Sequence, residues 1–347
     1  MNRLTPPVAD HGFLRRLGLV LGALALIFFV YRVSDLVLLA FGAALGGLLL
    51  ATAADALAAR TPLPRGMALA LAVLALFAVL GLIGTLFGTE LVGQADQLKE
   101  TLPRDWARLR GQLEANAMGR LLTQSLSQGS GGGGIAHAVI GTAWGAVETF
   151  ANFLIILVGA IFFAAQPGLY KRGLILLAPP PYRAVAGDAI DDVARALRRW
   201  LLTQLVSMVL MGVMIGLGLA WSGVSAAAAL GLLGGLSEFI PYVGPTLAMV
   251  PALVMALTGG GSVWGVLATY AVVRIVQANL ITPLLSQRLV SVPPGLYLFL
   301  ILGAGAVFGT YGLFFAGALA VTFYTLVVRL YVRETLGDDV PVPGSGD

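Results

Sequence analysis

Residues 231–260 read GLLGGLSEFIPYVGPTLAMVPALVMALTGG, and this stretch decides the fold. Glu238 lies in the middle of long uncharged runs and is followed closely by Pro241, Gly244 and Pro245. Proline has no backbone N–H and blocks a continuous helix, so a helix that reaches these residues must break. Lipid does not tolerate exposed, unpaired backbone, so such a break must be packed in protein or line a watery cavity. The stretch therefore predicts a broken helix with a carboxylate at the break.

The composition places this break in a membrane protein. The chain has 347 residues, of which 58% are hydrophobic and 11% are charged, and its mean hydropathy is +0.91. A soluble protein carries roughly twice that share of charged residues. Several uncharged runs exceed the ~20 residues that cross a bilayer. We therefore expect an all-α polytopic membrane protein, with the lipid bilayer as its first partner.

Hydropathy and charge divide the chain into membrane and non-membrane parts. We expect about seven to eight membrane segments, counting re-entrant ones, and two amphipathic helices outside the bilayer. The predicted parts are 1–89 (N-terminal transmembrane helices), 90–148 (an extracytoplasmic amphipathic segment with a Gly-rich linker), 149–170 (a transmembrane helix), 171–199 (a cytoplasmic amphipathic helix), 200–335 (a C-terminal transport unit with a re-entrant hairpin) and 336–347 (a cytoplasmic tail).

The basic residues orient the protein. Lys and Arg gather in the N-terminal tail, in the 55–65 and 166–199 loops and at the C-terminal end, whereas the long 90–148 loop balances its basic residues with acidic ones. Under the positive-inside rule both termini lie in the cytoplasm. The compact, multi-pass pattern suggests a bacterial inner membrane. Because these basic residues flank apolar runs as topology determinants do, the net charge of +4 does not predict a nucleic-acid partner.

The C-terminal half contains two interrupted hydrophobic units. Val224–Ser237 and Thr246–Gly259 would each rise about 21 Å as helices, which is short of a hydrocarbon core of ~30 Å. Two short helices that meet at a Pro/Gly turn indicate a re-entrant hairpin in preference to two full spans. A later uncharged run is interrupted at Gly309–Gly312. Paired interruptions of this kind indicate a transport site.

Each candidate residue has a functional and a structural interpretation. A buried Glu238 could bind a proton or cation, or it could hydrogen-bond the broken helix. Arg274 could be its counter-ion or could extend to an interface. Gln204, Gln277 and Asn279 could line a polar path or join helices by hydrogen bonds. The predicted substrate or ion path comprises Glu238, Pro241, Tyr242, Gly244, Pro245, Arg274, Asn279, Gly309 and Gly312.

Signatures of enzymes and cofactors are missing from the sequence. There is no cysteine, and His11 and His137 lie in a tail and beside a linker, so no His/Cys metal cluster is predicted. Gly131–Gly134 lacks the strand, lysine and hydroxyl context of a phosphate-binding loop. We therefore expect no enzymatic activity, no cofactor and no metal site.

Several motifs resemble the AI-2E family of bacterial membrane proteins. The most specific is Ser237-Glu238-Phe239-Ile240-Pro241-Tyr242-Val243-Gly244-Pro245, followed by Val250-Pro251-Ala252; further matches are Leu102-Pro103, Ile190-Asp191, Asn279-Leu280-Ile281-Thr282-Pro283 and Phe308-Gly309-Thr310-Tyr311-Gly312-Leu313. The resemblance covers most of the chain and is specific in 190–320. Gly317-Ala318 stands where the family usually has a proline, so the final helix should be less kinked here.

The resemblance implies a multi-pass inner-membrane transporter that forms homo-oligomers, with pentamers as one form. It further implies export of a small polar metabolite such as autoinducer-2, or sodium/proton exchange. We expect alternating access around a midplane site near Glu238. The alternatives are an antiporter that uses Glu238 and a membrane scaffold that transports nothing.

Overall fold

The computed structural model describes residues 33–85, 135–240, 243–258, 261–281, 293–338 and 340–341, and helices dominate this part of the chain, which contains no strand. Six of these helices are long and apolar enough to cross a membrane, and a bent pair brings the number to seven. The all-α polytopic fold is thus confirmed. The expected first span before Arg32 and the amphipathic helix and Gly-rich linker of 90–134 lie outside the described residues.

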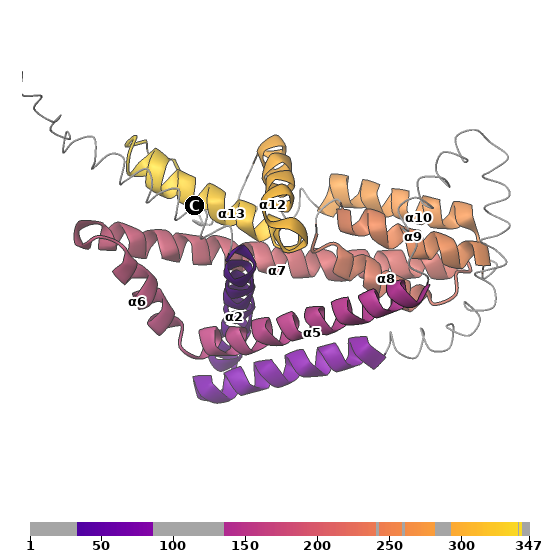
Figure 1. The fold of residues 1–347 in the computed structure, drawn as a ribbon, viewed down its shortest axis with the longest axis horizontal. Coiled ribbons are helices and arrows are strands. Elements are labelled where there is room, and N and C mark those ends of the chain that lie inside the picture. The colour runs from indigo at the N-terminus through magenta and orange to yellow at the C-terminus, as the bar shows by residue number, and fades with distance from the viewer. Residues whose placement is uncertain are drawn as a thin grey trace, which may run out of the picture.

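Three N-terminal helices pack through small residues. They are α2 (Ser34–Arg60), the Arg65–Thr85 helix, which Figure 1 draws in purple without a label, and α5 (Ile135–Ala165). A Cβ on Gly159 would overlap the Cβ of Ala43 at 2.7 Å, so the backbones of α5 and α2 can approach only because glycine has none. This close contact fixes α2 across α5.

The helix of the expected 149–170 span is longer and ends earlier than expected. It begins at Ile135, directly after the Gly-rich sequence, and ends at Ala165. Gln166 then breaks the helix, and α6 (Pro167–Leu177) leaves at an angle of 92°. Proline suits the first turn of a new helix because its missing N–H would have no intrahelical partner there. Residues 167–170 therefore belong to α6, not to the span.

The amphipathic helix of 182–199 and the fifth span form one continuous helix. This helix, α7 (Arg183–Trp221), follows the short 3-10 turn η1 (Pro180–Tyr182) and has 39 residues without an internal proline. Its buried residues recur at helical spacing from Ala189 to Leu219. Figure 1 shows α7 as the longest element, with the other C-terminal helices arranged along it.

The predicted hairpin follows α7. Its legs are α8 (Ala227–Ser237) and α9 (Val243–Thr258), and both ends meet, because the Ser262 N–H donates to the Ser222 carbonyl at 3.0 Å. α8 lies on α7 through glycines: a Cβ on Gly235 would lie 2.8 Å from the Gly212 Cα. The chain thus enters and leaves the segment at one point, as a re-entrant hairpin requires.

The remaining helices complete the C-terminal half. α10 (Val263–Val276) continues into the π-helical turn η2 (Gln277–Ile281) and runs beside α9. α12 (Pro294–Phe314) leads into α13 (Ala316–Leu326) and the π-helical η3 (Val327–Arg333). Within α12, Gly309 has φ 62° and ψ −144°, which interrupts the helix. The second predicted break is therefore present.

Candidate functional site

Glu238 lies at the tip of the hairpin and is buried. It follows the last residue of α8, and its side chain is 8% exposed. A buried carboxylate is costly unless it is paired and hydrogen-bonded. The side chains that contact it come from two other parts of the chain: α7, and the junction of α10 with η2.

Polar side chains hold both the backbone and the carboxylate of Glu238. The Gln204 side-chain amide donates to the Glu238 carbonyl oxygen at 2.8 Å. The Gln277 amide donates to Glu238 Oε1 at 2.6 Å. Arg274 Nη1 lies 3.6 Å from the same oxygen and donates to the Gln277 side-chain oxygen. Gln277 therefore bridges the two charged groups. We call Gln204, Glu238, Arg274 and Gln277 the tip cluster.

The two charged side chains of the tip cluster differ in their exposure to the surface. The Arg274 side chain is 36% exposed, compared with 8% for Glu238. Glu238 is thus held inside the protein, whereas Arg274 reaches from the cluster to the surface of the chain. The structure places the two residues as counter-ions, which was one of the two interpretations of Arg274.

Gly244 and Pro245 are buried behind the tip, at the start of α9. A Cβ on Gly244 would fall far inside van der Waals contact of the Ser237 carbonyl oxygen. The Gly244 N–H also donates to the Ile240 carbonyl at 3.0 Å. Glycine is therefore required for the close return of the chain. Pro241 and Tyr242 lie outside the described residues.

The remaining predicted residues are not in the tip cluster. The Asn279 amide donates to the Ile275 carbonyl one turn earlier on the same helix, at 2.9 Å, and the side chain is exposed. Gly309 and Gly312 form the second break: a Cβ on Gly309 would meet open space, whereas one on Gly312 would overlap the Ala304 carbonyl oxygen. Beside this break the Asn152 amide of α5 donates to the Tyr311 hydroxyl.

Phe239 connects the hairpin tip to the second broken helix. Its ring lies 5.9 Å from that of Trp200 on α7 and 4.6 Å from that of Phe314 at the end of α12. The sequence analysis quoted Phe239 only as part of the resemblance and assigned it no role. The signal that could have identified it is an aromatic residue directly after the only carboxylate of a long apolar stretch.

A second polar centre lies near the start of α7, around Asp188 and Asp192. Arg329 Nη2 lies 2.9 Å from Asp188 and 3.4 Å from Glu334, and Arg329 Nε lies 3.5 Å from the buried Asp192, which also pairs with Arg195. These contacts join the end of η3 to the charged first half of α7.

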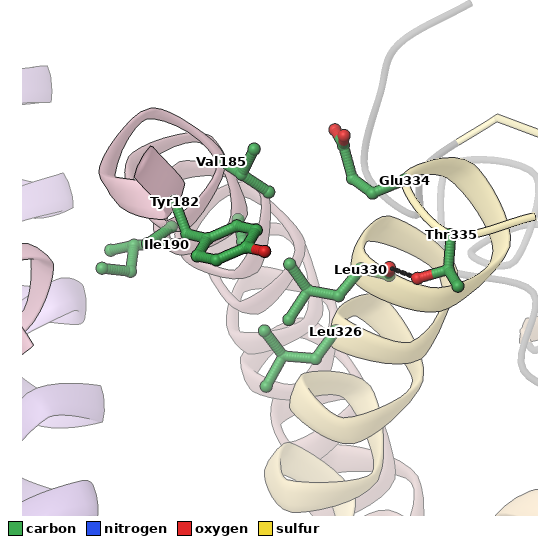
Figure 2. Close-up of a pocket in the computed structure, with 9 residues that line it drawn as sticks. Tyr182, Val185, Ile190, Leu326, Leu330, Glu334 and Thr335 are labelled. Carbon is green, nitrogen blue, oxygen red and sulfur yellow. Dashed lines mark hydrogen bonds between the residues drawn. The ribbon is translucent and has the colours of Figure 1, made fainter. Parts of the chain in front are cut away.

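A cavity of about 540 Å³ lies next to these ion pairs. Figure 2 shows the Tyr182 ring turned towards Leu326 and Leu330, with Ile190 on the far side of that ring and Glu334 at the edge; the full lining comprises Tyr182, Val185, Ala186, Ala189, Ile190, Leu326, Leu330, Glu334 and Thr335. None of the predicted path residues lines this cavity. It is therefore distinct from the tip cluster.

Relatives of this chain carry names that refer to transport. "Putative transport protein YrrI" of Bacillus subtilis is 27% identical over 203 residues, which cover 56% of this chain and 58% of the relative. "Putative permease PerM" of Escherichia coli is 23% identical over 182 residues, or 52% of each chain. "Putative transport protein YdiK" of Escherichia coli is 33% identical over 144 residues, which cover 41% of this chain and 39% of the relative.

These matches span about half of the length of the relatives or less. A broader match comes from the sequence model of the AI-2E family transporter, which covers residues 17–331 and so includes the α2–α5 layer, the hairpin and both breaks. The chain belongs to the AI-2E transporter family.

Proposed function

We propose that the protein moves a small polar metabolite, of the class of autoinducer-2, out of the cell by movement of the α8–α9 hairpin around the tip cluster. One observation carries this proposal: a buried carboxylate at the tip of a helical hairpin meets an arginine and two glutamines from other helices. Such groups can exchange hydrogen bonds among themselves for hydrogen bonds to a polar solute. Intramembrane ionisable groups commonly mark substrate or ion pathways.

The hairpin suits alternating access because the chain enters and leaves it at one end, so its tip has no covalent connection to the other helices. Ser222 and Ser262 join the ends of the hairpin at 3.0 Å, and the tip is held by side chains. Movement of the tip would break the Gln204 and Gln277 contacts while the hinge stays closed. Broken helices of this kind line the sites of many transporters.

A second candidate is sodium/proton antiport that uses Glu238. The observation that favours it is that Oε1 of the buried Glu238 carboxylate contacts both Gln277 and Arg274. A proton or a sodium ion on Glu238 would compete with Arg274 for the same oxygen. Both candidates depend on the tip cluster and differ in the species that moves.

Purified protein in liposomes separates the candidates. Flux of labelled autoinducer-2 that needs no sodium gradient supports export, and dye-reported proton movement driven by a sodium gradient supports antiport. In either case we expect Glu238→Gln to lower the flux by at least about tenfold, because the charge at the site is lost. Asp35→Asn, which removes an exposed carboxylate at the start of α2, should leave the flux within about twofold.

The absence of both fluxes from intact oligomers would contradict transport and favour a membrane scaffold. A flux that persists unchanged in Glu238→Gln would contradict the assignment of the site while leaving transport in place. The homo-oligomer itself is part of this proposal and can be measured as the mass of the purified particle before reconstitution.

We further infer that the protein lies in a bacterial inner membrane with its C-terminal end in the cytoplasm. Trp221 and Trp264 are 94% and 81% exposed beside the hinge of the hairpin. Cysteines at these positions should both react with an impermeant thiol reagent from outside, whereas Asp338→Cys should react from the cytoplasm. Reaction of Trp221→Cys and Trp264→Cys from opposite sides would show that the hairpin is not re-entrant.

A further inference from the structure

The tip cluster lies close to one end of the membrane-spanning part of α7. Trp200 and Trp221 are 21 positions apart on this helix, a rise of about 32 Å, which matches a hydrocarbon core of ~30 Å. Tryptophan is enriched at both membrane interfaces. Arg198 and Arg199 directly precede Trp200, and Trp221 is exposed at the other end. This spacing and composition assign these residues to the two boundaries of the span.

Gln204, which binds the Glu238 carbonyl, is one helical turn from Trp200, or about 6 Å along α7. The distance from Gln204 to Trp221 is about 26 Å by the same rise. The hairpin legs α8 and α9 lie along the longer of these two parts, between Gln204 and Trp221. By this rise the tip cluster lies about 10 Å from the midpoint of the Trp200–Trp221 span, towards Arg198–Trp200. We call this boundary of the span the arginine side.

Three aromatic rings occupy the short side. Trp200 packs edge-on against Phe239, and Phe239 is tilted against Phe314. Trp200 is 7% exposed and belongs to a buried cluster with Leu197, Leu201 and Phe315. We call Trp200, Phe239 and Phe314 the aromatic layer. It is about one helical turn thick, whereas the hairpin on the other side of Glu238 is several turns long.

Two adjacent residues at the tip thus contact different helices. Glu238 makes its side-chain contacts to α10 and η2, and Phe239 makes its ring contacts to α7 and α12. The Phe314 ring in turn lies 4.9 Å from that of Phe315, directly before α13. Displacement of the tip must therefore separate Phe239 from the second broken helix.

We propose that Phe239, held between Trp200 and Phe314, is the gate that separates the tip cluster from the arginine side of the span. The gate residue is carried by the same hairpin tip as Glu238, so opening of the gate and rearrangement of the tip cluster are one movement. The α12 break at Gly309 lies one turn before Phe314 and gives the partner ring its own freedom to move. This inference rests on the proposed transport function.

Thiol accessibility tests the gate without a transport assay. The chain contains no cysteine, so Ser237→Cys provides a single thiol beside Glu238. An impermeant thiol reagent is applied to reconstituted protein from the arginine side or from the Trp221 side. Phe239→Ala in this background should accelerate labelling from the arginine side by at least about tenfold, the ratio that two lost ring contacts support. Phe314→Ala should accelerate it less, because Phe239 then keeps its ring contact with Trp200.

Phe41→Ala is the matched control. Phe41 packs edge-on against Phe315 in the same buried cluster, so its loss loosens the cluster without removing a ring of the aromatic layer. It should leave the labelling rate within about twofold. If Phe239→Ala does not give a monodisperse protein, Phe239→Leu removes the ring contacts with a smaller loss of volume.

Two results would overturn the gate: a labelling rate that Phe239 substitution leaves unchanged, or an equal acceleration from both sides, which would indicate general loosening. Neither result depends on flux. A protein that transports but lacks this side-specific change contradicts the gate alone, whereas a protein that shows the change but moves no solute contradicts the proposed function alone.

Discussion

The two breaks in the C-terminal half are stabilised in different ways. At the hairpin tip, Glu238 is buried and bound by side chains from other helices, and Gly244 is packed against Ser237. At the second break, Gly309 is exposed and has open space around its Cα, and its φ of 62° is what interrupts the helix. The first break depends on contacts and the second on backbone conformation.

This difference assigns a binding role to the hairpin tip and a hinge role to the break at Gly309. A break that depends on contacts brings polar groups together and changes when those contacts change. A break that depends on one glycine dihedral can bend without rearranging its surroundings, because nothing is packed against that glycine. Phe239 and Phe314 connect the two, at 4.6 Å between ring centroids. The following substitutions test how far the breaks differ.

The largest effect is expected for Gly244→Ala. The new methyl group would overlap the Ser237 carbonyl oxygen, which belongs to the backbone and cannot turn away. Overpacking of this kind costs about 3 kcal/mol. Thermal unfolding in detergent should show the loss, with Gly303→Ala as the control, because a Cβ there meets nothing within 4 Å. Equal stability of the two variants would show that the hairpin tip is not tightly packed.

A smaller loss is expected for Gly309→Ala. There is room for the methyl group, but φ 62° with ψ −144° is a region that essentially only glycine occupies, and holding alanine there costs about 2 kcal/mol. The same Gly303→Ala control applies. A neutral result would mean that α12 straightens when alanine is present, which a shift in the Phe239 gate measurement would also report.

The tip cluster should respond unequally to the loss of either charge. Arg274→Gln leaves the 8% exposed carboxylate without its counter-ion, whereas Glu238→Gln leaves an arginine that already reaches the surface. After discounting for that exposure, we expect losses in the free energy of unfolding of about 1.5 kcal/mol and below about 1 kcal/mol. The double variant should be non-additive. Additive losses would show that Glu238 and Arg274 do not interact.

A similarly small effect is expected for Tyr311→Phe beside the second break. The substitution removes the hydroxyl that accepts from Asn152 and should cost about 1 kcal/mol. Tyr331→Phe, on a ring that is 56% exposed, is the control and should change the unfolding free energy by less than about 0.5 kcal/mol. A larger loss than that of Gly309→Ala would assign the stability of this break to its side chains.

The breaks themselves could be predicted from the sequence because they are local. Proline disfavours a helix that continues from α8 through Pro241 and Pro245, and the short legs predicted a helical hairpin, whose ends meet at the Ser222–Ser262 contact. The continuity of α7 could not be predicted from charge pattern alone. An amphipathic stretch and an apolar stretch form one helix when no proline or turn separates them.

The partners at the tip were harder to predict because they depend on how helices rotate about their axes. Arg274 was one candidate counter-ion, and its contact with Glu238 is present. Asn279, two residues after Gln277, binds the backbone of its own helix instead, since two positions along a helix point to different faces. Phe239 gave no periodic signal, because it lies in a turn.

The unbroken length of α7 makes it a lever. Its 39 residues rise about 58 Å, with the Arg329 ion pairs near one end and the glycine surface under α8 near the other. A tilt of about 5° about one end of a rod of this length displaces its other end by about 5 Å. Any event that rotates the charged half of α7 therefore also shifts the surface on which the hairpin rests.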